Sequence, residues 1–163
     1  MGEHICFRRN ERLATVNPHW RGNPVVRGKF VNRQHRFRPG MGSVLKWRLS
    51  PNPQRKEKKS VKWSPKLNYL RSLDGVVGNS LIWLGHNSFF LQLGRKRIMF
   101  DPVFGDIPFV KRQSDFPANP DIFTDIDYLL ISHDHFDHLD KQSVARLVKN
   151  NPGMKLFCGL GTG

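Results

Sequence analysis

Three histidines and three aspartates crowd the segment "ISHDHFDHLD", residues 131–140, directly after an apolar run. If the backbone is still extended there, the strand period of two sends His133 and His135 to the same side. Asp137 and His138 follow where the chain must turn, so their side chains can converge on a second position a few ångströms away. Because zinc in proteins accepts neutral imidazole and carboxylate ligands, the H-x-H-x-D-H spacing predicts a metal site.

The alternative is a set of surface histidines at the start of a helix, with Asp137 or Asp140 acting only as the N-cap. One histidine would fit that interpretation. Four candidate ligands at this spacing favour the metal site. Asp134 lies between the two ligand histidines, and we expect it to point away from them and to make structural hydrogen bonds.

The elements around this segment are predicted from short local patterns. Residues 128–132, "YLLIS", form a continuous apolar run of the kind expected for a strand covered on both faces. A helix is predicted from about Leu139 to Asn150, and a second strand at residues 155–158. The apolar face of the helix is marked by Val144, Leu147 and Val148. The result is a strand–helix–strand unit, with the candidate ligands at the carboxyl end of its first strand, where open α/β sheets bind ligands.

Upstream, residues 81–94 and 97–102 are apolar segments separated by a turn at Gly94–Lys96, and we predict a β-hairpin. Residues 102–126 are predicted to form a long loop, which in a compact domain is more often functional than idle. Its phenylalanines either form an apolar groove for an acyl chain or, the favoured alternative, anchor the loop to the core; they are Phe104, Phe109, Phe116 and Phe123.

Positive charge is concentrated in the first part of the chain. The formal charge is +14, and residues 1–71 carry 18 Lys and Arg against three acidic residues. No helical or strand period is sustained there, so we predict an irregular basic arm over residues 1–75 and a separate α/β domain over residues 76–163. A tail or strap is the favoured role, ahead of an arm that binds a polyanion such as nucleic acid or an anionic membrane surface.

Two cysteines that are far apart, Cys6 and Cys158, indicate neither a disulfide framework nor a thiolate zinc site. A reducing compartment, the cytoplasm, fits this count. The chain has no apolar run long enough to span a bilayer, so any membrane association is expected to be peripheral.

Residues 133–138 resemble the HxHxDH signature of the metallo-β-lactamase fold, whose members are mostly metal-dependent hydrolases. The segments 83–93, 100–104 and 129–140 are similar in order and spacing to the branch that contains N-acyl-phosphatidylethanolamine-hydrolysing phospholipase D. The resemblance implies an α/β fold of the αββα sandwich type. It also implies two zinc ions per complete domain, with manganese or iron as alternatives.

By this resemblance, His133 and His135 bind the first metal, and Asp137 and His138 bind the second. Asp101 would be the carboxylate that orients a metal ligand, the alternative being a turn-forming Asp before Pro102. His86 and Asp137 are the candidate catalytic residues, although a histidine held in a tight turn is the favoured interpretation of His86.

In the family, a further His, a bridging Asp and a final His complete the two metal sites later in the chain. This sequence stops before them, so we expect the N-terminal half of the sandwich, with an apolar sheet face left exposed and either poor solubility or completion by another chain. The predicted function is hydrolysis of a small-molecule or lipid phosphodiester or a related ester. The alternatives are a sugar-phosphate lactonase, a nucleic-acid-binding protein or nuclease that uses the basic arm, and an inactive truncated fragment.

Overall fold

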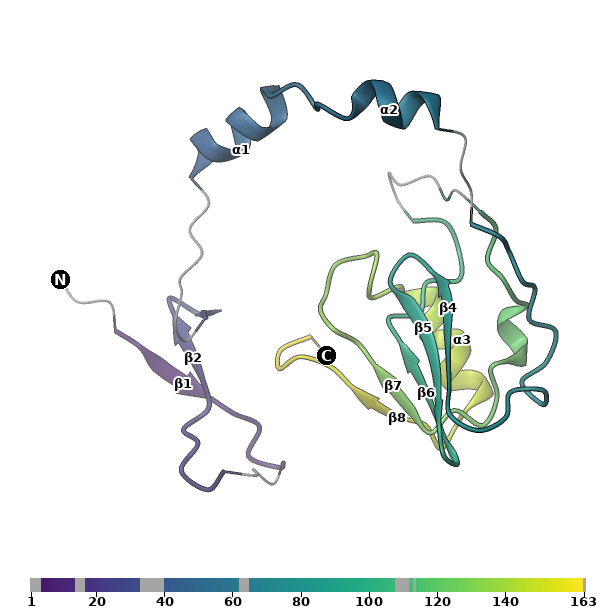
Figure 1. Cartoon of the computed structure of the whole chain (residues 1–163). Helices are drawn as coiled ribbons and strands as arrows, with labels where there is room; N and C mark the ends of the chain where they lie inside the picture. The colour runs from purple at the N-terminus through teal and green to yellow at the C-terminus, as the bar shows by residue number, and fades with distance from the viewer. Residues whose placement is uncertain are drawn as a thin grey trace. The chain divides into compact units, whose positions relative to one another are not determined.

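The computed structural model describes residues 4–13, 17–32, 40–61, 65–107, 112 and 114–162. The chain divides into two compact units, Met1–Lys62 and Trp63–Gly163. Figure 1 shows the elements of each unit in chain order. Within the described residues, every helix is too short or too polar to cross a membrane.

The first unit has regular structure, so the prediction of an irregular arm was wrong. It contains an antiparallel sheet and two short helices: β1 (Cys6–Arg8), β2 (Asn23–Val26), β3 (Lys29–Phe30), α1 (Met41–Leu49) and α2 (Arg55–Ser60). Val25 and Val26 on β2 are buried, whereas neither helix has a buried residue. The strands are only two to four residues long, too short for their sequence to show a period, and β1 pairs with β2 across up to 19 residues of chain, as at Cys6 and Val25.

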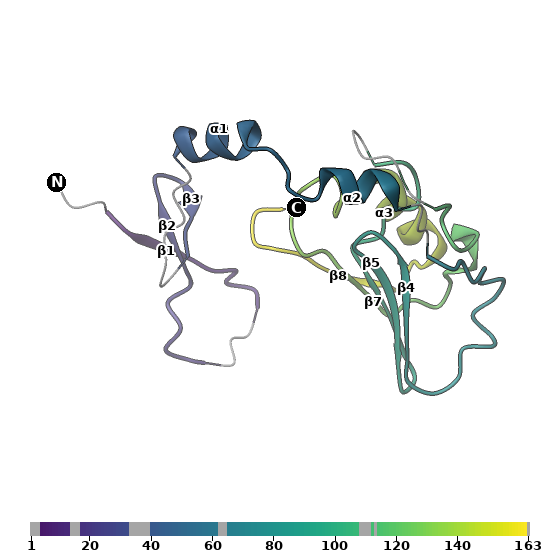
Figure 2. The same ribbon diagram turned by 45° about the horizontal axis from the view of Figure 1, so that its top comes forward.

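A five-stranded sheet forms the centre of the second unit. Its strands are β4 (Ser80–Gly85), β5 (Ser88–Leu93), β6 (Lys96–Phe100), β7 (Tyr128–Leu130) and β8 (Lys155–Phe157). They lie side by side in the order β4-β5-β6-β7-β8, as Figures 1 and 2 show. The β4–β5 and β5–β6 pairs are antiparallel, and the β6–β7 and β7–β8 pairs are parallel. Helix α3 (Lys141–Asn150) connects β7 to β8, which confirms the predicted strand–helix–strand unit.

The apolar segment over residues 81–94 forms two strands, β4 and β5, joined by a turn at His86 and Asn87, as the interpretation of His86 as a turn residue implied. The register shifts between Trp83 and Gly85, and the backbone of Gly85 then adopts a φ of 98°. A positive φ is readily adopted only by glycine, so the turn begins where the sequence supplies one.

Residues 65–75, which the sequence pattern assigned to the arm, contribute to the second unit. The Leu70 N–H donates to the Pro117 carbonyl (2.7 Å), and Leu73 is buried in the core. The long loop between β6 and β7 contains a short 3-10 helix, η1 (Pro120–Ile122). Among its described residues, the Phe104 N–H donates to the Ser143 hydroxyl and Phe123 is fully buried. The loop is therefore packed against the core.

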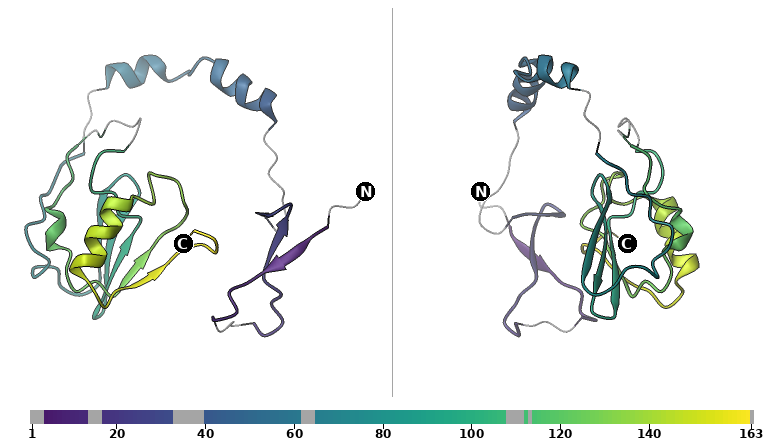
Figure 3. Two further views of the ribbon diagram at one scale, coloured as in Figure 1. Left: turned by 180° about the vertical axis from the view of Figure 1, so that it is seen from behind. Right: turned by 45° about the vertical axis from the view of Figure 1, so that its right-hand side comes forward.

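One face of the sheet packs under α3, as Figure 3 shows. Phe90, Met99 and Leu129 from three neighbouring strands are fully buried there with Leu147 of α3. The predicted apolar face of the helix needs one correction, because Val148 is 48% exposed. The buried residues of α3 are Leu147 and Ser143. The Ser143 hydroxyl is satisfied because it accepts a hydrogen bond from the Phe104 N–H (2.8 Å).

Candidate metal centre

The candidate site lies at one edge of the five-stranded sheet. Strands β4, β6 and β7 run in the same direction, so the residues that follow their carboxyl ends gather at that edge. His86 follows β4, Asp101 follows β6, and the segment 131–140 follows β7. Asp140 caps helix α3, because its carboxylate accepts a hydrogen bond from the Ser143 N–H (2.9 Å).

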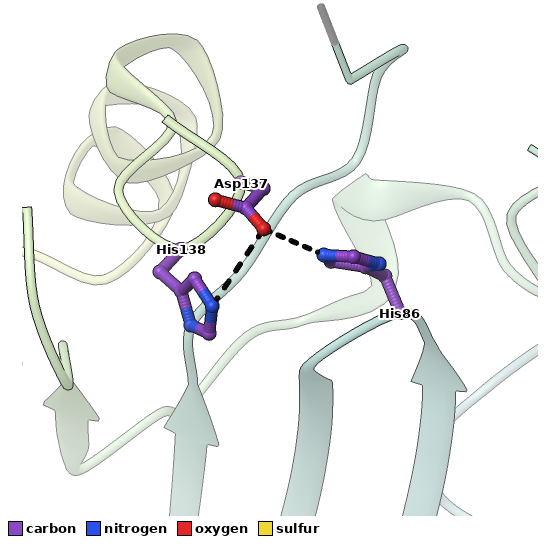
Figure 4. Close-up of side chains that lie close together, drawn as sticks. All are labelled: His86, Asp137 and His138. Carbon is purple, nitrogen blue, oxygen red and sulfur yellow. Dashed lines mark hydrogen bonds and ion pairs between the residues drawn. The ribbon is translucent and has the colours of Figure 1, made fainter. Parts of the chain in front are cut away.

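Three potential metal ligands point toward one another at this edge (Figure 4). His86 Nε2 lies 2.9 Å from Asp137 Oδ2, and His138 Nε2 lies 3.7 Å from the same oxygen. One ligand atom from each of the three residues lies within 4.8 Å of the others. Asp137 and His138 were expected to share one metal, and the structure places them together. His86, which the sequence pattern favoured as a turn residue, is the third member of this group.

The donor set and its spacing fit a metal ion. Two imidazole nitrogens and a carboxylate oxygen are common zinc ligands, and tetrahedral coordination at 2.0–2.2 Å separates neighbouring ligand atoms by about 3.3 Å. The distances of 2.9 and 3.7 Å at Asp137 Oδ2 lie on either side of that value.

Asp101 holds His138 in one orientation. Its Oδ2 lies 2.9 Å from His138 Nδ1 and accepts a hydrogen bond from the Ser132 hydroxyl (2.6 Å), while its Oδ1 accepts one from the Ser132 N–H (2.7 Å). An ionised carboxylate only accepts hydrogen bonds, so His138 Nδ1 carries the proton in this contact. His138 Nε2 is then left with its lone pair facing Asp137, as a metal ligand requires.

Asn87 and Ser132 take part in the site although the sequence analysis did not single them out. Asn87 Nδ2 donates to His138 Nε2 (2.9 Å), and the Ser132 hydroxyl lies 2.9 Å from His133 Nδ1. Their only signal in the sequence is position, since one follows His86 in the β4–β5 turn and the other precedes His133. Because Asn87 contacts the nitrogen that would bind the metal, its amide must move aside when an ion enters.

His133 and His135 lie next to this group. Their ring centroids are 4.5 Å apart, and the His133 ring is 3.9 Å from that of His138. Among the described residues, the one group of three potential ligands within 4.8 Å is His86, Asp137 and His138. The structure therefore brings His133 and His135 together without a third ligand. Asp134 between them is exposed to solvent.

Two site residues have an unusual backbone conformation. His86 has a φ of 48° and Asp101 a φ of 41°, in the left-handed region that non-glycine residues rarely adopt. Such strain persists only where the surroundings hold it. For His86, the carbonyl accepts a hydrogen bond from Trp83 Nε1 (2.9 Å), and for Asp101 the carbonyl accepts one from the Ser88 hydroxyl (2.7 Å).

The electrostatics of the site favour an ionised Asp137. The hydrogen bond from His86 lowers the pKa of Asp137 below its ordinary value, and the nearby His138 acts in the same direction. A carboxylate that stays ionised at neutral pH keeps both oxygens available as acceptors or metal ligands.

The loop phenylalanines anchor the loop instead of lining a groove. Phe123 is fully buried and stacks on Phe104 with ring centroids 5.8 Å apart, and Phe116 packs edge-on against Phe104 at 5.1 Å. These contacts support the favoured alternative, in which the loop is fixed to the core. Phe109, the fourth phenylalanine, lies outside the described residues.

Comparisons with known proteins match the part of the chain that carries this site. Residues 80–154 match the family described as the Beta-lactamase superfamily domain. The chain is 29% identical over 154 residues to N-acyl-phosphatidylethanolamine-hydrolyzing phospholipase D 1 of Caenorhabditis elegans, covering 85% of this chain and 43% of that protein. It is 35% identical over 77 residues to a UPF0173 metal-dependent hydrolase of Saccharolobus solfataricus, covering 47% of this chain and 31% of that protein. The chain thus spans less than half the length of these curated relatives.

Proposed function

We propose, on the premise that residues 80–154 are part of a metallo-β-lactamase-fold domain, that this chain supplies metal-binding residues of a zinc-dependent phosphodiester hydrolase. The observation that carries the proposal is the convergence of His86, Asp137 and His138 on one point, with Asp101 behind His138. Both the donor types and their spacing suit zinc.

Each residue has a distinct part in this proposal. His86, Asp137 and His138 would hold the ion, and Asp101 would keep the proton on His138 Nδ1 so that Nε2 stays a ligand. His133 and His135 are proposed as ligands of a second ion, since their rings lie beside the first group. A bound zinc ion supplies Lewis acidity, which polarises a phosphoryl oxygen and lets water act as a nucleophile at neutral pH.

A phosphodiester is the proposed substrate class. Its hydrolysis concentrates negative charge on phosphoryl oxygens, and a cationic centre at the sheet edge stabilises that charge. The C. elegans relative is named as a phospholipase D, which favours a lipid phosphodiester over the lactone alternative.

Zinc binding by the full chain tests the metal site directly. In competition with a chromogenic chelator, we expect the wild-type chain to bind zinc, and His138→Gln or Asp137→Asn to weaken binding at least about tenfold. His19→Gln is the matched control, because His19 is an exposed histidine of the first unit. Equal zinc affinity in all four proteins would contradict the proposed site.

Hydrolysis of a soluble phosphodiester tests the reaction and separates it from a nucleic-acid function. We expect the zinc-loaded chain to hydrolyse bis(p-nitrophenyl) phosphate at a rate that changes little with salt. Binding to single-stranded DNA through the basic first unit would instead fall steeply with salt. A chain that binds zinc tightly but hydrolyses neither this diester nor a lactone would retain the metal site and overturn the hydrolase assignment.

A further inference from the structure

We propose that the Arg112 guanidinium binds the phosphate group of the substrate beside the candidate metal centre. The inference rests on the proposed function for the class of ligand, a phosphodiester, and adds a residue that recognises its charge. Arg112 lies in the long loop between β6 and β7 and is half-buried. Its position, its available donors and its charge each point to an anion.

The guanidinium lies between the two chain segments that carry His86 and Asp101. Its Nη2 donates to the carbonyl of Val103, two residues after Asp101. Its Nη1 faces Gly85, the residue before His86, since a Cβ atom added to Gly85 would lie 3.4 Å from Nη1. Both segments follow strands that end at the same edge of the sheet. The positive charge is therefore held at the edge where the candidate metal ligands gather.

The guanidinium keeps one edge of its fork available for an anion. Arginine has five N–H donors in one plane, arranged as a side edge, Nε with Nη2, and an end edge, Nη1 with Nη2. The side edge is occupied, because Nε donates to the Gly105 carbonyl (2.9 Å) and Nη2 donates to the Val103 carbonyl. Among the described residues, no acceptor lies within hydrogen-bonding distance of Nη1. The two parallel N–H groups of the end edge match two oxygens of a phosphate.

Contacts with the loop hold the guanidinium in place before a ligand binds. The two carbonyls fix its side edge, and the Phe116 ring centroid lies 5.7 Å from Arg112 Cζ. Phe116 in turn packs against Phe104, and Val103 is buried. A side chain fixed in this way loses little conformational entropy when it binds an anion, which favours affinity.

The acceptors of Arg112 leave its positive charge uncompensated, because both are backbone carbonyls without formal charge. Within the part of the chain that the structure describes, Arg112 forms no ion pair. Burial lowers the pKa of Arg112, and the charge of Asp106 offsets only part of this effect. A half-buried cation is stabilised by a bound anion, and a phosphodiester supplies that charge whereas a neutral ester or lactone does not.

Binding of diethyl phosphate to the full chain tests the proposal, because this diester carries one negative charge. By isothermal titration calorimetry, we expect Arg112→Gln to weaken binding at least about tenfold, since two charge-assisted hydrogen bonds are lost. Arg112→Lys should weaken it by a smaller factor, because lysine keeps the charge without the fork. Arg95→Gln is the matched control and should bind as the wild type does, since Arg95 is an exposed arginine in the β5–β6 turn.

Triethyl phosphate separates charge from shape, because it keeps the phosphoryl oxygen but has no charge. We expect no saturable binding of triethyl phosphate to the wild type. Circular dichroism and urea unfolding establish that each variant is folded before affinities are compared. A purely structural role for Arg112 predicts lower stability with unchanged affinity for diethyl phosphate, so the two measurements distinguish the roles.

Each titration is run with zinc and again with a chelator in its place, which separates the anion site from the metal site. Affinity within about twofold of wild type in Arg112→Gln would overturn the proposal even if zinc binding and hydrolysis persist. Equal binding of triethyl phosphate would overturn it too, as would a wild-type chain that binds neither compound. Arg112-dependent binding that survives in chelator and in His138→Gln would retain the anion site even if the hydrolase proposal fails. If Arg112→Gln does not fold, wild-type affinity in Arg112→Lys would contradict the role of the fork.

Discussion

Replacing Asp101 by asparagine tests whether a carboxylate sets the proton position on His138. Asp101 is buried, and its side chain accepts hydrogen bonds from the Ser132 N–H, the Ser132 hydroxyl and His138 Nδ1. Asparagine has the same shape, so Oδ1 can still accept from the Ser132 N–H. An amide N–H₂ then stands where Oδ2 was, and it cannot accept the His138 Nδ1 proton.

The magnitude follows from the contacts that change. A hydrogen bond to a charged group contributes about 1.5–3 kcal/mol, and the two bonds that Oδ2 accepts, from His138 Nδ1 and from the Ser132 hydroxyl, are both lost in Asp101→Asn. The proton is then free to move to Nε2, where it would oppose the Asn87 amide and remove the lone pair that faces Asp137. Loss of such an orienting partner lowers metal affinity by about 10–100-fold.

Three measurements check this prediction: urea unfolding, zinc competition, and the tautomer of His138 from long-range ¹H–¹⁵N spectra. The spectrum should show an Nδ1–H imidazole in the wild type and a shift toward Nε2–H in Asp101→Asn. Asp134→Asn is the control, because it removes the same charge from an exposed neighbour of the site. Zinc affinity within about twofold of wild type in Asp101→Asn, with an unchanged tautomer, would refute the reasoning.

Three further predictions concern the helix and loop that support the site. Leu147→Ala should lower the free energy of unfolding by about 2–5 kcal/mol, because Leu147 is fully buried, whereas Val148→Ala should change it by less than about 0.5 kcal/mol in urea titrations. Asp140→Ala should cost about 0.5–2 kcal/mol through loss of the α3 cap, and a cost at or near zero would show that the cap is dispensable. The Arg146 guanidinium lowers the pKa of Asp121. This pair therefore stabilises the fold fully at pH values above the ordinary Asp pKa, and the effect is lost as the pH falls through the lowered pKa. The difference in free energy of unfolding between wild type and Arg146→Gln should accordingly vanish in acid.

Local patterns predicted the elements that follow one another closely in the chain. The continuous apolar run before His133 became β7, and the helix and strand after it became α3 and β8. Each of these depends on a pattern contained in about ten residues, together with the Asn-Pro-Gly stop that ends the helix. The position of the candidate ligands after β7 followed from the same patterns.

The parts that depend on distant contacts could not be predicted. His86 meets Asp137 across 51 residues, and no periodicity in the sequence reports that approach. The one local signal was Gly85 followed by His-Asn and then a small buried serine, which is the composition of a turn. The sheet of the first unit was not predicted because its strands are only two to four residues long, and because β1 pairs with a strand that lies 15 to 19 residues away in the sequence.

The mixed strand directions of the sheet have a consequence for how the protein folds. Strands β4, β5 and β6 are joined by tight turns, so we expect these three strands to pair early in folding. His138 reaches Asp101 only after a loop of 37 residues has closed and β7 has aligned on β6. Loop closure carries an entropic cost that delays such non-local contacts. We therefore expect the cluster of His86, Asp137 and His138 to form late in folding, after β7 has aligned on β6.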